Sequence, residues 1–153
     1  MISKSKNQLG ASIVQAGRLL TNRINSHFLA LGTNITFEQM EVLVLLSVNP
    51  KKKIIQNDLA VISQKNKSGI LRIIDILEKK RFVKRIPVEG DRRKNIIEAT
   101  EAGIKIGKEA IELFMKIDKE LTRKIHKSDV ITSNKVLDII KKECKPGKDQ
   151  IDQ

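Results

Sequence analysis

The sequence predicts a mostly α-helical fold with one small β-hairpin. Apolar residues recur every three or four positions along most of the chain, which is typical of amphipathic helices. From Phe82 to Val88 the period changes to two, and a turn signal at Glu89-Gly90-Asp91 precedes a second apolar stretch at Ile96-Ile97. Two short helices followed by such a hairpin have the layout of a winged helix-turn-helix. The 153 residues are enough for one domain with a real core and too few for two.

Positive charge is concentrated in one part of the chain. The net charge is +12, and residues 51–94 hold 14 basic and 5 acidic side chains. Residues 1–50 hold 4 basic and 2 acidic side chains, and residues 95–153 hold 12 and 11. A lysine-rich surface that only aids solubility would spread this charge evenly, whereas a polyanion is the natural partner of a local patch. We therefore expect nucleic acid as the partner.

Composition restricts the other classes of protein. The core must be built from Ile, Leu and Val, because there are four Phe and no Tyr or Trp. The longest uninterrupted apolar run is Val42–Leu46, far below the roughly 18 residues of a membrane span, so no membrane partner is expected. The polar N-terminus does not resemble a signal peptide. A single cysteine fits a cytoplasmic protein.

Two helices are expected before the basic segment. The first runs from Leu9 to Leu31, with Gly32 or Asn34 available for a left-handed cap. The second begins after Thr36, with Gln39 completing a capping box, and its few polar residues predict burial in the domain centre. Asn49-Pro50 ends it. The stripe of the first helix comprises Leu9, Ile13, Ala16, Leu20, Ile24, Phe28 and Leu31.

The helix pair follows. A short helix from about Asn57 to Ser63 leads into a turn at Gln64-Lys65, and Asn66 is a good N-cap for a helix that continues to about Lys80. This second helix is basic at its N-terminal end, which suits insertion into a DNA major groove. Its inner face holds Ile70, Ile73, Ile74 and Leu77, and its outer face holds Lys67, Ser68, Leu71, Arg72 and Asp75.

The hairpin is expected to be a basic wing. Pro87 cannot donate a ladder hydrogen bond and indicates an edge strand. The tip carries Asp91, Arg92, Arg93 and Lys94, and can lie along a phosphate backbone or reach a minor groove. Asp91 is expected to pair with one of the arginines.

Two more helices close the chain. Thr100 caps a long one, and Thr132 or Ser133 starts a last one that ends near Cys144. Together with the first helix they carry apolar stripes too long for a winged domain to cover, and a two-fold homodimer would bury them. The stripe of the long helix comprises Ile104, Ile111, Phe114, Ile117, Leu121 and Ile125.

No enzyme signature is present. His27 and His126 lie about a hundred residues apart, with no cysteine or acidic cluster at the spacing of metal ligands. There is no glycine-rich phosphate loop and no activated nucleophile. We expect no enzyme activity, no metal and no cofactor.

Several motifs resemble those of the MarR family, which includes SlyA-like proteins. The resemblance covers about Leu9 to Cys144, and Asp91-Arg92-Arg93 followed by Thr100-Glu101-Ala102-Gly103 is its most specific part. Two departures stand out: Gln64 and Arg81 occupy positions where the family commonly has glycine, and Arg81 in a left-handed cap would be strained by about 1 kcal/mol. The other matching residues are Asp58-Leu59-Ala60, Lys67-Ser68, Arg72, Asp75-Ile76-Leu77-Glu78-Lys79-Lys80, Val83 and Arg85.

The resemblance implies a homodimeric transcription regulator that binds a palindromic site in double-stranded DNA. Residues 1–153 would form a single MarR-like domain, with a DNA-binding lobe at about 35–100 and dimerisation helices at about 9–31 and 101–144. Arg93 would reach the minor groove, and Lys65 to Arg72 would face the major groove. Many relatives bind a small aromatic or phenolic effector between the dimerisation helices and the DNA-binding lobe. The expected DNA-binding residues are Gln64, Lys65, Asn66, Lys67, Ser68, Arg72, Arg92, Arg93 and Lys94.

Other functions stay open from the sequence. Repression is the simplest output of such a regulator, but activation is an alternative. An RNA-binding module is another, although single-stranded RNA readers usually stack bases on aromatic residues that are scarce here. A winged-helix module that docks a protein partner would need that partner to be acidic.

Overall fold

The computed structural model describes residues 8–48 and 53–144. Its elements confirm the predicted class, a mostly helical fold with a small antiparallel sheet. In chain order they are α1 (Leu9–Ala30), α2 (Phe37–Val48), β1 (Ile54–Ile55), α3 (Gln56–Ile62), α4 (Lys67–Lys79), β2 (Val83–Val88), β3 (Asp91–Ala99), α5 (Glu101–Thr122) and α6 (Lys127–Glu143).

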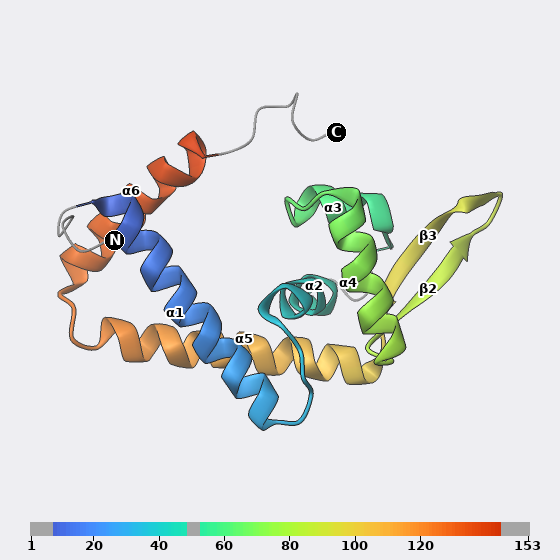
Figure 1. Ribbon diagram of the computed structural model, residues 1–153, viewed down its shortest axis with the longest axis horizontal. Helices are drawn as coiled ribbons and strands as arrows, with labels where there is room; N and C mark the ends of the chain where they lie inside the picture. Colours follow the sequence, from blue (N-terminus) through green and yellow to red (C-terminus); the bar gives the residue numbers. More distant parts are fainter. Residues whose placement is uncertain (1–7, 49–52, 145–153) are drawn as a thin grey trace, which may run out of the picture.

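Figure 1 shows how the elements are arranged around α5. This long helix runs beneath α2, and α3, α4 and the β2–β3 hairpin lie toward one end of the molecule. The N-terminal part of α1 and all of α6 lie toward the other end. The hairpin projects away from the body as a wing. The helix pair and the wing therefore share one end, and the outer parts of the first and last helices share the opposite one.

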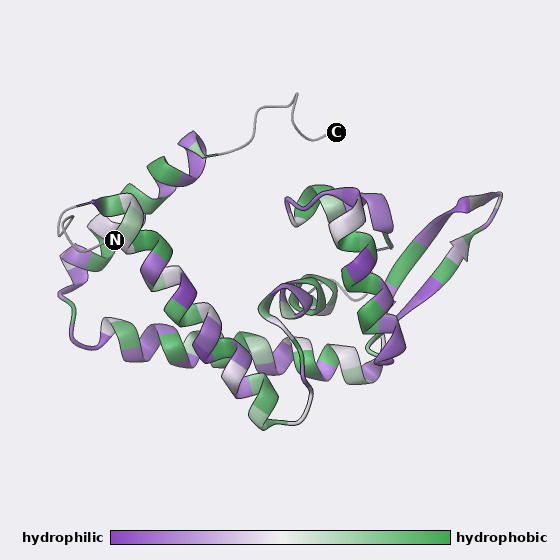
Figure 2. Cartoon of the chain, in the orientation of Figure 1, coloured by the Kyte–Doolittle hydropathy of each residue, from purple (hydrophilic) through white to green (hydrophobic). Residues whose placement is uncertain are grey.

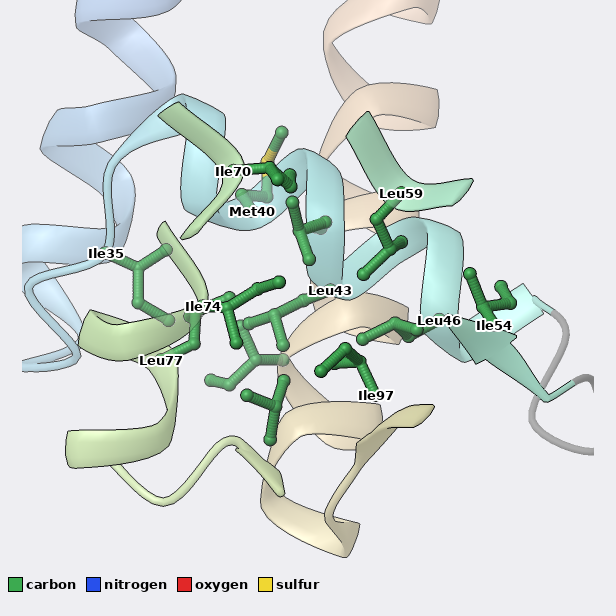
Figure 3. Packing of buried hydrophobic residues seen from close by; sticks show 14 of the residues in the cluster. Ile35, Met40, Leu43, Leu46, Ile54, Leu59, Ile70, Ile74, Leu77 and Ile97 are labelled. Carbon is green, nitrogen blue, oxygen red and sulfur yellow. The ribbon is translucent and has the colours of Figure 1, made fainter. Parts of the chain in front are cut away.

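Helix α2 forms the centre of the core. Its Val42 and Leu43 are fully buried, and side chains from α3, α4, β1 and β3 converge on it in Figure 3. The predicted capping box begins this helix, because the Gln39 N–H donates to Thr36 Oγ1 at 3.4 Å and the Thr36 N–H donates to Gln39 Oε1 at 3.5 Å. The predicted stop at Asn49-Pro50 lies outside the described residues.

The sheet has the order β1-β3-β2, so β2 is an edge strand, as Pro87 predicted. A two-residue turn at Glu89-Gly90 joins β2 to β3, with Gly90 at φ +81°. The register shifts between Pro87 and Val88. Strand β1 was not expected. Its two residues pair with Ile96 and Ile97 of β3 and connect the start of α3 to the base of the wing.

The inner face of α5 differs from the predicted stripe. Of that stripe only Ile117 is buried, and the remaining buried residues are Gly103, Ile106, Gly107 and Ala110. Two glycines bring the helix close to its neighbours: a Cβ on Gly107 would lie 2.0 Å from Ser47 Oγ, and one on Gly103 would lie 2.0 Å from the Phe82 carbonyl oxygen. Contact between α2 and α5 therefore depends on small residues.

The last helix begins earlier than predicted. It starts at Lys127 instead of Thr132 or Ser133, and the preceding helix ends at Thr122, before Ile125. His126 is the N-cap, since its Nδ1 accepts from the Ser128 N–H at 3.4 Å. A histidine is an unusual cap, which is why the sequence pattern misplaced this boundary.

Helix α6 buries none of its side chains against the rest of the described chain. Helix α1 buries only two of its seven stripe residues, Ile24 and Phe28. Both helices leave large apolar side chains exposed, and apolar segments (green) alternate with polar ones along them in Figure 2. The most exposed are Val14, Leu19, Leu29 and Ile139.

Candidate nucleic-acid interface

The helix pair is joined by a tight turn. Gln64 follows α3 with φ +53°, and its N–H donates to the Val61 carbonyl at 3.2 Å while the Lys65 N–H donates to the Ala60 carbonyl at 3.0 Å. These two hydrogen bonds form a Schellman motif, which usually has glycine at the position of Gln64. The left-handed backbone explains why the family commonly has glycine there.

Asn66 begins α4 as predicted. Its Oδ1 accepts from the Gly69 N–H at 2.6 Å and from the Ser68 hydroxyl at 3.0 Å. Asn66 Oδ1 therefore caps the start of the helix, and no described residue accepts a hydrogen bond from the side-chain amide nitrogen of Asn66. Asn66 therefore has a structural role as the N-cap of α4, in addition to its predicted role in DNA binding.

The outer face of α4 is basic and open. Lys67 and Arg72 are exposed, and neither makes an ion pair with another residue of the described chain. On the opposite face Ile70, Ile74 and Leu77 are buried, so the helix cannot rotate without losing its core contacts. The two cations are held outward by the burial of the inner face.

Lys65 is placed differently from the other predicted cations. Its Nζ lies 3.2 Å from Glu41 Oε2 on α2, and its side chain is 24% exposed. This ion pair fixes the turn between α3 and α4 to the central helix. Lys65 is therefore less available to a phosphate than Lys67 or Arg72.

The wing carries the remaining predicted residues, Arg92, Arg93 and Lys94, at the start of β3. Asp91 was expected to pair with an arginine, and the described contacts add a lysine: Lys94 Nζ lies 3.1 Å from Asp91 Oδ2, and the Arg93 backbone N–H donates to Asp91 Oδ1 at 3.1 Å. The hydrogen bond from Lys94 and that backbone N–H lower the pKa of the Asp91 carboxyl. The Arg93 side chain is exposed.

A small polar notch lies between the wing and the start of α3. Its volume is about 50 Å³, and it is lined by Ile55, Gln56, Asn57, Arg93, Lys94 and Asn95. The pairing of β1 with β3 brings these segments together. Amide and cationic groups that converge on so small a space suit a single phosphate group.

A network of charges connects the wing to α4. Arg85 on β2 contacts both Asp75 Oδ1, at 2.5 Å, and Glu78 Oε2. Its backbone N–H also donates to Glu78 Oε1 at 3.3 Å. Burial alone would lower the pKa of Arg85, but the two carboxylates outweigh it and raise that pKa. Arg85 is thus a structural cation, although it lies in the most basic segment.

An apolar groove of about 540 Å³ lies between α2, the end of α3 and α5. The rings of Phe37 and Phe114 meet edge to face across part of it, with centroids 6.2 Å apart. Glu41, Ser63 and Gln64 also line it, so its wall includes the turn that precedes α4. The other lining residues are Met40, Val44, Leu45, Val48 and Ile62.

Within residues 8–48 and 53–144, no group of three or more His, Cys, Asp or Glu side chains is placed to hold a metal ion. Nor is any helix there both long and apolar enough to cross a membrane.

Sequence reasoning missed three features of this surface: the Glu41–Lys65 ion pair, the role of Arg85 and the notch beside β1. The acidic residues at Asp75 and Glu78, one turn apart in a basic segment, were a usable signal for the second. The other two depend on β1 and on the orientation of α2, and no local pattern reports those.

Comparison with known proteins agrees with this geometry. The model of the MarR family matches residues 33–94. MepR of S. aureus in complex with DNA is 18% identical, covers 92% of this chain and 100% of its own, and has a TM-score of 0.83. A further structure of MepR is 20% identical, covers 90% of this chain and 99% of its own, and has a TM-score of 0.67. Wild-type MarR of E. coli is 23% identical, covers 87% of this chain and 96% of its own, and has a TM-score of 0.67.

No curated protein matches the chain by sequence. The family match spans α2, the helix pair and the start of β3, and the same fold continues along about nine-tenths of the chain. Residues 33–94 therefore match the MarR family, and the chain shares the fold of MepR and MarR along about nine-tenths of its length.

Proposed function

We propose that this protein is a sequence-specific regulator of transcription that binds double-stranded DNA. The observation that carries the proposal is the basic outer face of α4, with Lys67 and Arg72 exposed and free of ion pairs in the described chain, on the same end of the molecule as the projecting wing with Arg93. A helix of this kind fits a major groove, and a wing of this kind follows the adjacent backbone or minor groove.

The predicted contact residues take different parts in this proposal. Lys67, Arg72 and the side-chain amide of Asn66 would meet the major groove, and Gln64 and Ser68 would lie at its edge. Arg92, Arg93 and Lys94 would meet the backbone and minor groove, and the notch beside Asn57 would take one phosphate. Lys65 would act mainly through Glu41.

The protein would act as a homodimer on a palindromic operator. The apolar side chains left exposed on α1, α5 and α6 are the main support, because a two-fold partner would bury them. Two copies of the lobe at a fixed spacing would then read half-sites about one helical turn apart. Repression, by excluding polymerase from the operator, is the simplest output.

An effector that releases the DNA is supported by the groove. Its volume lies within the range of small-molecule sites, and Ser63 and Gln64 connect its wall to the start of α4. The charged residue that lines it is Glu41, which is paired with Lys65, so a neutral aromatic compound would suit it better than the aromatic or phenolic acid that the resemblance implies.

The two alternative functions are less well supported. The described surface of the lobe presents no exposed aromatic ring for stacking the bases of single-stranded RNA; Phe82 is partly buried against the core. A protein partner would have to be acidic enough to match Lys67, Arg72 and Arg93.

A titration with DNA tests the proposal. The purified protein is titrated against a duplex from its own upstream intergenic region, with an unrelated duplex and an RNA of equal length as competitors. We expect selective binding of two protomers per site. If about eight phosphates are contacted per dimer, log K should fall with log salt at a slope of about −7.

Equal affinity for all three nucleic acids, or none, would contradict the proposal. Preference for the RNA would favour the RNA-binding alternative. Selective binding with a slope near zero would contradict the role of the exposed lysines and arginines, because phosphate contacts release counterions.

A further inference from the structure

We infer that Arg85 is a positioning residue for DNA recognition, which fixes the angle between the wing and α4 so that both reach one duplex together. The inference rests on the proposed function and deepens it. Arg85 was part of the basic segment, but its surroundings exclude it as a contact to DNA.

Arg85 contacts two carboxylates that lie one turn apart on α4. Its guanidinium binds Asp75 Oδ1 at 2.5 Å and also binds Glu78 Oε2, and its backbone N–H donates to Glu78 Oε1 at 3.3 Å. Asp75 and Glu78 are three residues apart and so lie on one face of the helix. The planar guanidinium can bind both carboxylates at once, which a lysine cannot do.

Arg85 is also the main connection between these two elements. In the described residues, each side-chain hydrogen bond that joins α4 to the β2–β3 hairpin involves Arg85. The Arg85 side chain is 19% exposed and is paired with two negative charges, so it is held in place and unavailable to a phosphate. The neighbouring Lys84 points away and is exposed, 3.2 Å from Glu98 on β3.

Without this connection the wing would be attached through its base alone. Val83 is buried in the core, but β2 is an edge strand, and its register breaks between Pro87 and Val88. A wing free to change its angle would have to be ordered when DNA binds, and that ordering lowers affinity. The benefit of Arg93 should therefore depend on Arg85, because two linked contacts reinforce each other only when their geometry is fixed.

A double-mutant cycle measures this dependence. In the wild-type background, Arg93→Ala should lower affinity for the upstream duplex about tenfold, as expected for one arginine contact. In an Arg85→Met background the same change should cost less than about threefold. Arg72→Ala should cost the same factor in both backgrounds, because it lies on α4 itself.

Lys84→Met is the matched control, since it removes the same charge from the adjacent position of β2. It should leave the cost of Arg93→Ala unchanged. Equal costs of Arg93→Ala in the wild-type and Arg85→Met backgrounds would overturn the inference. Arg85→Lys should behave as Arg85→Met does. If Arg85→Met does not fold, as judged by circular dichroism, Glu78→Gln replaces it in the cycle.

A distance measurement tests the same inference without DNA. Spin labels are placed at Glu89→Cys and Lys79→Cys in a Cys144→Ser background and diluted with unlabelled chains. The distance distribution should be narrow with Arg85 and broad with Arg85→Met; equal widths would overturn the inference. If the wild type binds no DNA, the proposed function fails, and this measurement alone decides whether Arg85 holds the wing.

Discussion

The basic residues of the lobe differ in what already binds them. Lys65, Arg85 and Lys94 are paired with carboxylates of the same chain. Lys67 and Arg93 are exposed, and the described residues offer them no acidic partner. Residues 51–94, with a net charge of +9, therefore present fewer unpaired cations than their composition indicates. Substitution of an unpaired cation should change DNA binding, whereas substitution of a paired one should also change the structure that it holds.

Arg93→Ala should weaken binding to the upstream duplex about tenfold without changing the free energy of unfolding. Its side chain is exposed and anchors nothing in the core, while its backbone N–H to Asp91 is kept by alanine. Fluorescence anisotropy measures the affinity for the duplex, and chemical denaturation measures the free energy of unfolding. Lys135→Ala, an exposed cation on α6, serves as the control and should leave affinity unchanged. Unchanged affinity of Arg93→Ala would refute its role in the wing.

Gly107→Ala should destabilise the protein by about 2 kcal/mol. The new methyl group would lie 2.0 Å from Ser47 Oγ and 2.7 Å from the Leu43 carbonyl oxygen, so α5 would have to move away from α2. Gly10→Ala on α1 is the control, because nothing lies within 4 Å of its Cβ. Chemical denaturation compares the two. Equal stability of both variants would contradict the close contact between α2 and α5.

At the scale of elements, three helices end in the same way. α1, α3 and α4 each end in a Schellman motif, with Gly32, Gln64 and Arg81 at the left-handed position. Only the first is glycine. Around Arg81 the turn is well held: the Thr100 hydroxyl donates to the Arg81 carbonyl at 2.8 Å, and Lys80 Nζ donates to the Asn34 carbonyl.

Arg81→Gly should therefore stabilise the protein by about 1 kcal/mol, because glycine adopts φ +62° without steric cost. The Arg81 side chain is exposed, so no packing is lost. Lys79→Gly, two residues earlier inside α4, is the matched control and should cost about 1 kcal/mol. Thermal and chemical unfolding give both values. A loss of stability in Arg81→Gly would show that its side chain makes a contact that outweighs the strain.

Sequence patterns predicted those elements whose signals are local. The caps at Thr36, Asn66 and Thr100 and the inner face of α4 were all correct, because each depends on residues within one or two turns. The face of α5 that packs against α2 was not predicted, since Gly103 and Gly107 are buried for a steric reason that hydrophobicity does not record. Strand β1 has only two residues and exists through its pairing with β3.

The candidate site likewise has features that local sequence patterns predict and features that depend on tertiary structure. Its cations could be found from composition and spacing, and their exposure on α4 followed from the apolar period of that helix. The sequence could not predict which of these cations form ion pairs with carboxylates of the same chain. Glu41 is 24 residues from Lys65 and reaches it only because α2 crosses behind the turn. Those pairs depend on tertiary structure.

At the scale of the whole molecule, α1 and α6 carry exposed apolar surface toward the end opposite the wing. Val14, Leu19, Ile131 and Ile139 are among the exposed side chains of α1 and α6. Within the described chain, Arg23 of α1 forms an ion pair with Glu120 of α5 and lowers the pKa of that carboxyl. This surface is the physical reason to expect a second copy.

A chain that begins at Leu20 should lose the dimer. The truncation removes the first half of α1, including the exposed Val14 and Leu19, but keeps Ile24 and Phe28 in the core. Sedimentation should show monomers or aggregates. A chain that begins at Gln8 keeps all of α1 and should remain a dimer. A well-behaved dimer of the shorter chain would refute the role of α1 in assembly.

The exposure of helix α6 bears on the lifetime of a chain that has not assembled with a second copy. A helix of 17 residues with no buried side chain is marginal in water, so its structure would depend on a second copy. Each tenfold dilution removes about 1.4 kcal/mol from the stability of a dimer. At low abundance α6 would open and become a substrate for proteases, which cut unfolded segments first. Turnover would then remove lone protomers and spare assembled pairs.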